Sequence, residues 1–231
     1  MRVATWNVRH GRPRKGFASN RRLVEAVAML DVDVLGVQEV ERRVIRSWFA
    51  DQPAQIARAL GAAGTVRYAP ARRFAVIGSD GVALCVSGVI QKTRIVELPR
   101  ENAVQRRIAV IARAVVGDVV MTAATTHLHN DAPVARRQLE ALLDELSTEP
   151  APRLLLGDLN LRPEDVASPL RAAGFATVEA GPTEPAWAPM QRIDHIALDG
   201  FGAGTVSVPA VPVSDHRPLV VEVRPESRPR P

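Results

Sequence analysis

The chain has 231 residues, enough for one large α/β domain, and its 46% hydrophobic and 24% charged residues are an ordinary balance for a soluble protein. The lone cysteine, Cys85, excludes a disulfide framework and a cysteine-rich zinc site, and no stretch approaches the roughly 20 apolar residues of a membrane helix. The chain has 30 basic and 25 acidic residues, which give a net charge of +5, and all the basic residues except Lys15 and Lys92 are arginine. This charge favours anionic partners, phosphates above all.

Hydrophobic patterns in the first half of the chain predict strands and helices that alternate. A helix that Ser19 or Asn20 can cap runs to about Leu30, and a second helix ends at a glycine. The predicted strands are 2–8, 32–38 and 81–90, and the second helix is 52–61. Cys85, inside "VALCV", is predicted to be a buried core residue.

The second half continues the alternation. The predicted strands are 107–116, 119–128, 153–158, 192–198 and 218–223, and the clearest helix is 132–146. Proline-rich patches at 149–152 and 182–189 are predicted to be surface loops. Interleaved helices and strands indicate a layered α/β fold, and no break in composition marks a second domain. We therefore predict one domain over 1–224, followed by a disordered tail over 225–231.

Polar side chains recur where the predicted strands end. Taken singly, each has an ordinary explanation as a turn residue, a solvated charge or a buried histidine. In sheets of this kind, however, ligands bind where strand ends converge, so the recurrence predicts a functional site. The residues in this pattern are Asn7, Glu39, His127, Asp158, Asn160, Asp194, Asp215 and His216.

The residue types of this pattern suit phosphate chemistry with a hard metal ion. Carboxylate and amide oxygens, together with water and substrate phosphate, are the usual ligands of Mg²⁺. A hydrolytic water needs an oxygen base nearby, and the charge that develops on phosphorus needs donors such as Asn and protonated His. With no cysteine among them, these residues do not predict a structural zinc site.

Six motifs occur in an order and at a spacing that resemble one known family. They are "TWNV", "QEV", "THL", "GDLN", "RIDHI" and "SDHRPLVVEV", joined by a "GVALCVS" segment at 81–87. The set resembles the endonuclease/exonuclease/phosphatase superfamily, which includes DNase I-like and exonuclease III-like enzymes, over nearly the whole chain, residues 3–223. The resemblance implies a four-layer α-β-β-α sandwich, in which two mixed β-sheets pack face to face with helices outside.

The resemblance implies a metal site and a water-activating group at one rim of this sandwich. Position by position, Asn7 and Glu39 hold the divalent metal, Mg²⁺ or Mn²⁺ in its place, and Asp215 is a further ligand nearby. Asp158 orients and deprotonates the attacking water. Asn160 positions water or a phosphoryl oxygen.

The resemblance also implies groups that contact the phosphate. His216 contacts the scissile phosphate, and Asp194 hydrogen-bonds that histidine. His127 is a second contact. An arginine that opens the strand near residue 107 reaches into the site, and both Arg106 and Arg107 fit this role.

The chain departs from the family pattern in the segment before "GVAL". Some relatives orient the residue equivalent to His127 with a carboxylate from this segment, whereas here its one acid is Asp80, beside Arg72 and Arg73. This difference favours phosphate binding over general-acid duty for His127. In "GDLN", leucine replaces the commoner phenylalanine at an inward apolar position.

These observations lead to an expected function and to rivals. We expect a Mg²⁺-dependent phosphodiesterase, a nuclease acting on DNA or RNA, that works in the cytoplasm as a monomer without membrane insertion. The first alternative is a phosphatase or phosphodiesterase for a small or lipid-derived phosphate, because fold does not decide substrate. The others are a dinuclear metallophosphatase and a catalytically silent nucleic-acid-binding module.

Overall fold

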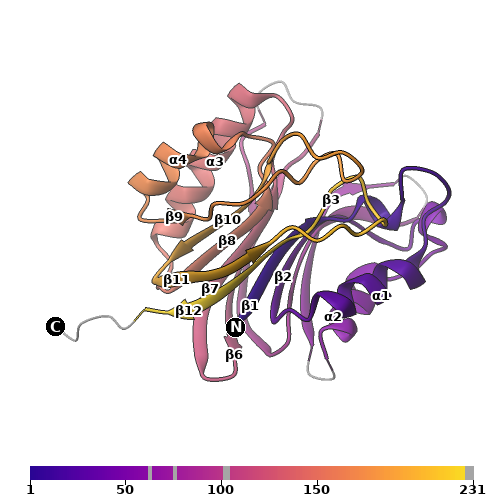
Figure 1. Cartoon of the computed structure of the whole chain (residues 1–231), viewed down its shortest axis with the longest axis horizontal. Coiled ribbons are helices and arrows are strands. Elements are labelled where there is room, and N and C mark those ends of the chain that lie inside the picture. The colour runs from indigo at the N-terminus through magenta and orange to yellow at the C-terminus, as the bar shows by residue number, and fades with distance from the viewer. Residues whose placement is uncertain (62–63, 75–76, 101–104, 227–231) are drawn as a thin grey trace.

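Two β-sheets packed face to face, with helices on both outer faces, make up the chain (Figure 1). The computed structural model describes residues 1–61, 64–74, 77–100 and 105–226. In Figure 1, helices α3 and α4 lie on one side of the sheets and helices α1 and α2 on the other. This is the four-layer α-β-β-α sandwich that the sequence motifs predict.

The first sheet carries both ends of the described chain. Its strand order is β11-β12-β1-β2-β4-β3, with β1 parallel to β2 and every other pair antiparallel. In that order, the strands span Phe201–Ser207, Leu219–Pro225, Arg2–Asn7, Val34–Arg42, Ser79–Val86 and Thr65–Arg73. Both β1 and β2 are buried along most of their length, as their apolar sequences require at the centre of a covered sheet.

The second sheet has the order β5-β6-β7-β8-β10-β9, with β7 and β8 parallel and the other pairs antiparallel. In that order, the strands span Val89–Glu97, Ile108–Val116, Val119–His127, Arg153–Asp158, Asp194–Asp199 and Ala176–Thr177. The parallel pair needs a crossover connection, and helix α3 (Ala132–Ser147) provides it. Edge strand β5 contains only half-buried and exposed residues, whereas central β8 is buried from Leu154 onward.

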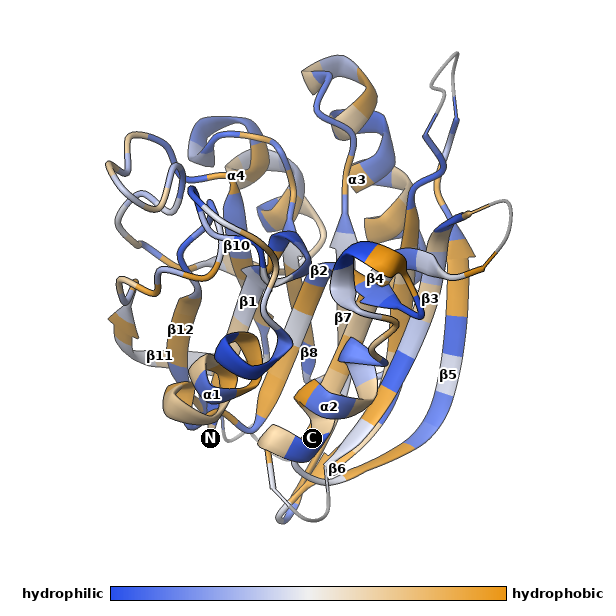
Figure 2. Ribbon diagram, turned by 90° about the vertical axis from the view of Figure 1, so that its right-hand side faces the viewer, coloured by the Kyte–Doolittle hydropathy of each residue, from blue (hydrophilic) through white to orange (hydrophobic). Residues whose placement is uncertain are grey.

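The helices begin where short polar side chains cap them. Ser19, Asp51 and Asp131 each accept a hydrogen bond from a backbone N–H in the first turn of the helix that follows. Figure 2 shows α1 and α2 in front of the first sheet. The helices α1, α2 and α4 span Asn20–Leu30, Gln52–Ala59 and Pro163–Ala172. In the described part of the chain, none of the helices is long and apolar enough to cross a membrane.

Three apolar clusters hold the layers together. One lies between the two sheets, one between the first sheet and α1 with α2, and one between the second sheet and α3 with α4. Cys85 is fully buried in the second cluster, as the sequence predicts.

Polar groups and a glycine join the two sheets near one end of the sandwich core. The buried Gln38 side chain donates to the hydroxyls of Thr5 and Thr125, each at 3.1 Å, so β2 is tied to β1 and across to β7. A Cβ at Gly36 would lie 2.7 Å from Thr125 Oγ1 and 2.8 Å from Leu156 Cβ. The glycine is therefore required by packing, and the sheets meet closely two residues before the ends of β1 and β8.

One predicted strand is wrong in its extent. The stretch 81–90 is two strands, β4 and β5, which belong to different sheets. The chain leaves the first sheet at Ser87, whose N–H and hydroxyl both bond to Asp33. A Cβ at Gly88 would lie 2.0 Å from the Val115 carbonyl oxygen, so the connection to the second sheet passes very close to β6.

Several elements were absent from the predicted set. Strands β3, β9 and β11 and helix α4 were not predicted, and β2 runs four residues further than the predicted end at Gln38. Strand β12 extends to Pro225, and residues 227–231 of the predicted tail lie outside the described residues. The patch 182–189 is a loop with largely exposed or half-buried residues, but Thr183 within it is fully buried.

Candidate active site

Strand pairing brings three of the predicted site residues into one row. Asp158, the last residue of β8, pairs with His127 at the end of parallel β7 and with Asp194 at the start of antiparallel β10. Because β10 runs opposite to β8, its first residue lies beside the last residue of β8. The row therefore lies at a single rim of the second sheet, although 67 residues of sequence separate His127 from Asp194.

The first sheet contributes Asn7 and Glu39 to the same rim. Asn7 ends β1, and its amide Nδ2 donates to Glu39 Oε1 at 3.3 Å and to Asp158 Oδ2 at 3.0 Å. Glu39 has a positive φ of 51°, at a register shift between Val37 and Val40 in the pairing of β2 with β4. Such a bulge redirects a side chain out of the regular alternation, and here it turns the Glu39 carboxylate toward Asn7.

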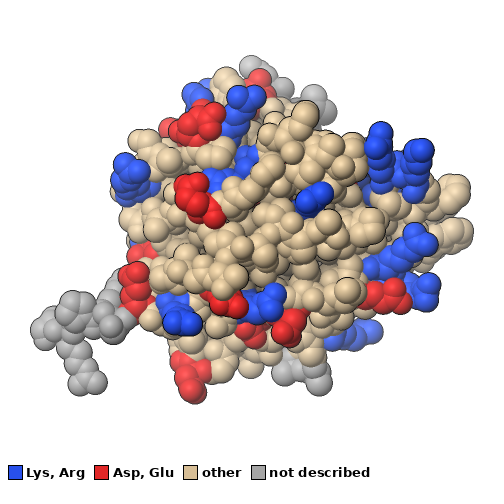
Figure 3. All heavy atoms as spheres, in the orientation of Figure 1, with Lys and Arg blue, Asp and Glu red and all other residues tan. Residues whose placement is uncertain are grey.

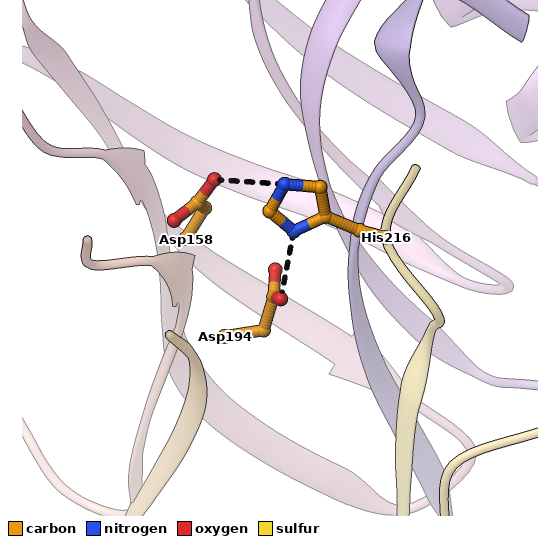
Figure 4. A group of neighbouring side chains, drawn as sticks. All are labelled: Asp158, Asp194 and His216. Atoms are coloured by element: carbon orange, nitrogen blue, oxygen red, sulfur yellow. Dashed lines mark hydrogen bonds and ion pairs between the residues drawn. The ribbon is translucent and has the colours of Figure 1, made fainter. Parts of the chain in front are cut away.

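His216 is held between two carboxylates (Figure 4). Its Nδ1 lies 2.9 Å from Asp194 Oδ2, and its Nε2 lies 3.9 Å from Asp158 Oδ2. Thr183 donates its hydroxyl hydrogen to the same Asp194 oxygen at 2.6 Å. The hydrogen bond to Asp194 fixes the orientation of the ring, so that Nε2 points toward Asp158.

Electrostatics of this group favour a charged His216. Burial alone would lower the pKa of His216, but the Asp194 carboxylate outweighs it, with help from Asp158 and Asp215, and the pKa rises to about 10. Burial, followed by the neighbouring Asp194, raises the pKa of Asp158 above its ordinary value. The His216 ring is thus a cation at neutral pH, and the carboxyl groups of Asp194 and Asp158 on either side of it both favour the charged form.

The backbone beside His216 is anchored to β1. The indole Nε1 of Trp6 donates to the His216 carbonyl oxygen at 2.9 Å, and Ser214 Oγ donates to the Asn7 carbonyl oxygen at 2.7 Å. Trp6 and Ser214 are both buried. The loop that carries His216 is therefore fixed to the strand that carries Asn7.

Asp215, next to His216 in the chain, forms an ion pair with Arg9. The Oδ2 atom of Asp215 is 3.2 Å from Arg9 NH1. The pKa of Glu39 is raised mainly by burial and also by the charge of Asp215, while the hydrogen bond from Asn7 lowers it. The two carboxylates therefore share one electrostatic environment, although Arg9 holds the Asp215 side chain in this structure.

His127 and Asn160 both contact the Asp158 segment. The Nε2 of His127 is 3.5 Å from Asp158 Oδ2, and burial, followed by Arg107, keeps the pKa of His127 well below its ordinary value. Asn160 has a positive φ of 51°, its N–H donates to Asp158 Oδ1 at 3.1 Å, and its Nδ2 donates to the Leu128 carbonyl oxygen. The turn after β8 is thus closed on Asp158 itself.

The two candidate arginines point to different places. Arg107 lines a pocket of about 300 Å³ together with Glu39 and His127, and its Nε is buried without a hydrogen-bond partner among the described residues. Arg106 instead lies 3.0 Å from Glu97 and donates to the Pro70 carbonyl oxygen. Of the two, Arg107 is the one whose side chain borders the rim that carries Glu39 and His127.

The same pocket contains residues that the motifs did not indicate. Arg46, Arg72 and Asp80 line it, and so does His10, whose Nδ1 lies 3.3 Å from the Glu39 carbonyl oxygen. Arg46 forms a short ion pair with Glu41 and lies 3.5 Å from Asp80. No sequence motif indicates this grouping, because Arg46 lies in the connection between β2 and α2 and Arg72 lies near the end of β3. We call this the arginine pocket.

The donor set at the rim fits a hard divalent cation. The carboxylates of Glu39 and Asp158 both accept from the Asn7 amide Nδ2, while the Asn7 amide oxygen accepts from the Arg9 N–H. Asp158, Asp194 and His216 each place one ligand atom within 4.8 Å of the others. No cysteine is present at the rim. Oxygen-rich sets of this kind suit Mg²⁺ and Mn²⁺ rather than a structural zinc ion. The acidic rim can therefore hold a divalent metal ion.

A two-sheet sandwich with an acidic rim beside an arginine pocket is the arrangement expected of a phosphoester hydrolase that binds a metal ion. A family model described as the Endonuclease/Exonuclease/phosphatase family matches residues 4–216, so the chain belongs to that family. Members of this family hydrolyse phosphoester bonds, and the chain is such a hydrolase. A comparison with curated protein sequences gave no match.

Solved structures share the fold at low sequence identity. An endonuclease/exonuclease/phosphatase from Beutenbergia cavernae superimposes with a TM-score of 0.81 at 22% identity, over 98% of this chain and 72% of that chain. A Bacteroides thetaiotaomicron mannosyl-6-phosphatase gives 0.75 at 17% identity, over 97% and 99%. The human Nocturnin catalytic domain with bound sulfate gives 0.71 at 16%, over 97% and 93%. At these identities the similarity shows the fold, and the substrate has to be argued from the site.

Proposed function

We propose that this protein is a Mg²⁺-dependent phosphodiesterase that cleaves DNA or RNA by attack of an activated water. The observation that carries the proposal is the Asp158–His216–Asp194 group beside Asn7 and Glu39, next to the arginine pocket that Glu39 and His127 line. Such a group offers a base for water, a cation for the phosphate and oxygen ligands for a metal within one rim.

Asp158 is the base in this proposal. Its carboxylate is buried, is oriented by the Asn7 amide and the Asn160 N–H, and lies at the end of β8, where a water can approach between His127 and His216. A raised pKa brings a carboxylate closer to the working pH, which is favourable for general-base catalysis.

His216 and His127 have different roles in phosphate binding because one is protonated and the other is neutral. A protonated His216, supported by Asp194, donates through Nε2 to a phosphoryl oxygen and stabilises the negative charge that develops there. His127 stays neutral and positions the phosphate by hydrogen bonding. Arg107, with a free buried Nε, offers a second cationic contact to the same group.

Glu39, Asn7 and Asp215 would hold the metal ion, with Asp158 adjacent. When bound, Mg²⁺ would neutralise a non-bridging phosphate oxygen and ease departure of the leaving group. Release of Asp215 from Arg9 is part of this proposal, because the carboxylate pairs with that arginine in the present structure.

A nucleic-acid substrate is supported by charge. The chain carries a net charge of +5, and Lys and Arg side chains gather toward one end of the face in Figure 3, where the indigo and violet loops lie in Figure 1. The rival reading of a non-catalytic binding module would be supported by loss of Asp158, His216 or Glu39, and all three are present at one rim.

A substrate panel tests this proposal. Purified protein is incubated with single- and double-stranded DNA, RNA, inositol phosphates and bis(p-nitrophenyl) phosphate, each with Mg²⁺, with Mn²⁺ and with chelator. We expect metal-dependent cleavage of nucleic acid and of the simple diester. Full activity in excess chelator, or turnover of phosphate monoesters with nucleic acids left intact, would overturn the proposal.

A further inference from the structure

The loop between β2 and α2 displays large apolar side chains to solvent. Ile45, Trp48 and Phe49 are 73%, 76% and 53% exposed, although such side chains are normally buried or half-buried. We call these three residues the loop tip. They are consecutive or nearly so in the sequence, so the exposure is concentrated at one point rather than scattered over the surface.

The backbone of the loop tip is held in a conformation that costs energy. Trp48 and Phe49 have positive φ values of 55° and 56°, which bulky residues rarely adopt. The loop is closed by hydrogen bonds from Phe49 N to Val44 O and from Arg43 N to Ala50 O, and Asn20 donates to the Ser47 carbonyl oxygen. The two rings are therefore presented by a fixed turn rather than by a loose segment.

The loop tip adjoins the arginine pocket. Arg46, one residue after Ile45, lines the pocket that also contains Glu39, Arg107 and His127. On the neighbouring hairpin, a Cβ at Gly78 would lie 2.4 Å from the Arg43 carbonyl oxygen, so the two loops touch. The two rings therefore follow, two and three residues later in the same loop, an arginine that lines the pocket.

Guanidinium groups connect the loop tip with the rim. Arg46 and Arg72 stack against the Phe74 ring, at 5.6 and 4.9 Å from its centroid, and both line the arginine pocket with Arg107 behind them. Arg43 and Arg73 are exposed nearby. Within the described residues, no salt bridge involves Arg43, Arg72 or Arg73, so these cations are available to an anionic ligand.

We propose that the loop tip and these arginines bind the single-stranded nucleic acid that flanks the scissile phosphate. Bases stack on Trp48 and Phe49, and the backbone phosphates follow the arginines into the pocket toward His127. Aromatic rings next to a cationic groove are the usual means of binding single strands, and stacking requires bases that are not already paired in a duplex. This inference rests on the proposed nuclease function and specifies that the substrate is single-stranded.

The pocket chemistry favours a strand over a lipid. An exposed Trp and Phe ringed by arginines also suits an anionic membrane surface. A lipid phosphate would need an apolar route for its chains toward the rim, whereas the route here is lined mainly by charged and polar groups, Arg46, Arg72, Asp80 and Gln105 among them. At about 300 Å³ the pocket is at the lower end of the usual range for ligand pockets, which suits a single nucleotide unit.

A binding experiment tests the inference without cleavage. Fluorescence anisotropy of a labelled dT12 strand is measured in chelator with wild type and with the double variant Trp48→Ala/Phe49→Ala. Loss of two stacking partners should weaken binding by at least about tenfold. A matched control, Phe17→Ala, removes a ring that is 89% exposed on another loop and should bind as the wild type does. The variant Trp48→Tyr/Phe49→Tyr keeps two stacking rings and should restore most of the affinity.

The hydrolysis of bis(p-nitrophenyl) phosphate separates this inference from the proposed function. This small diester reaches only the rim, so the double variant should hydrolyse it at the wild-type rate while its kcat/KM on dT12 falls. If the wild type cleaves dT12 and the double variant binds and cleaves it equally well, the inference is wrong and the function stands. Failure of the wild type on every diester refutes the function instead. Binding to phosphatidylglycerol vesicles that depends on the rings, with unchanged dT12 binding, would overturn the strand assignment in favour of a membrane.

Discussion

Replacing Asp194 by asparagine is the sharpest perturbation of the charge balance at the rim. The side chain keeps its size and loses its charge, so packing around it changes little. In the wild type, the pKa of His216 rises from 6.5 to about 10 because Asp194 overcomes the effect of burial. Since one pKa unit corresponds to about 1.4 kcal/mol, the charged ring is favoured by on the order of 5 kcal/mol, a contribution that Asp158 and Asp215 share.

The sign of the expected pH effect follows from this rise. A raised pKa in the folded state stabilises the protein below pH 6.5, and the stabilisation is lost as the pH rises toward 10. Without the Asp194 charge, burial dominates and His216 loses its proton at lower pH. We expect the upper pH limit of kcat/KM to fall by at least about two pH units, and activity at neutral pH to fall about 10²–10⁴-fold.

The assay is the pH profile of kcat/KM with bis(p-nitrophenyl) phosphate, together with an NMR titration of the His216 ring. Asp118→Asn is the matched control, because Asp118 is exposed in the turn between β6 and β7, at the end of these strands opposite to Arg107 and His127. An Asp194→Asn profile whose upper limb coincides with that of the wild type would refute the reasoning.

A double variant tests whether Asp194 acts through His216. If it does, His216→Ala already removes what Asp194 supports, and the combination Asp194→Asn/His216→Ala should be little worse than His216→Ala alone. If the single losses multiply, the 2.9 Å hydrogen bond between the two side chains is not what makes Asp194 important.

Three further predictions concern packing, anchoring and metal binding. Gly36→Ala should lower the free energy of unfolding by about 1–3 kcal/mol through overpacking between the sheets, whereas Gly181→Ala, with open space around it, should leave chemical denaturation unchanged. Trp6→Phe should cost about 1–3 kcal/mol in the same measurement by leaving the buried His216 carbonyl unpaired, and should also lower kcat; an unchanged kcat would argue against anchoring. Glu39→Gln should raise the Mg²⁺ concentration for half-maximal activity by at least about tenfold, a loss of about 1.4 kcal/mol in binding, and an unchanged Mg²⁺ titration would exclude Glu39 as a ligand.

The elements that the sequence predicts best are those with strong periodicity or a continuous apolar run. The helices after Ser19 and Asp131 and the buried strand of three leucines before Gly157 all carry such signals. Strand β3 does not, because Pro70 lies inside it, and four of the seven residues of β11 are polar or glycine. Helix α4 has a proline start and acids in its first turn, signals that were available, but Pro169 interrupts its pattern.

The site could be predicted as a set of residues but not as an arrangement. Each rim residue follows or precedes an apolar strand, so the sequence identifies it, yet only the register of β8 with β7 and β10 places Asp158 between His127 and Asp194. The choice between Arg106 and Arg107 needed the side-chain directions at the start of β6. In the same way, nothing in the sequence shows that Trp48 faces solvent, since most tryptophans are largely buried.

The most direct test of the central claim is the turnover of Asp158→Asn on single-stranded DNA with saturating Mg²⁺. If Asp158 activates the water, kcat should fall by at least about 10²-fold, while strand binding in chelator and the unfolding temperature stay close to those of the wild type. A variant that folds, binds the strand and cleaves it at a near-normal rate would contradict the account, because Asp158 would then be an ordinary turn residue with no role in catalysis.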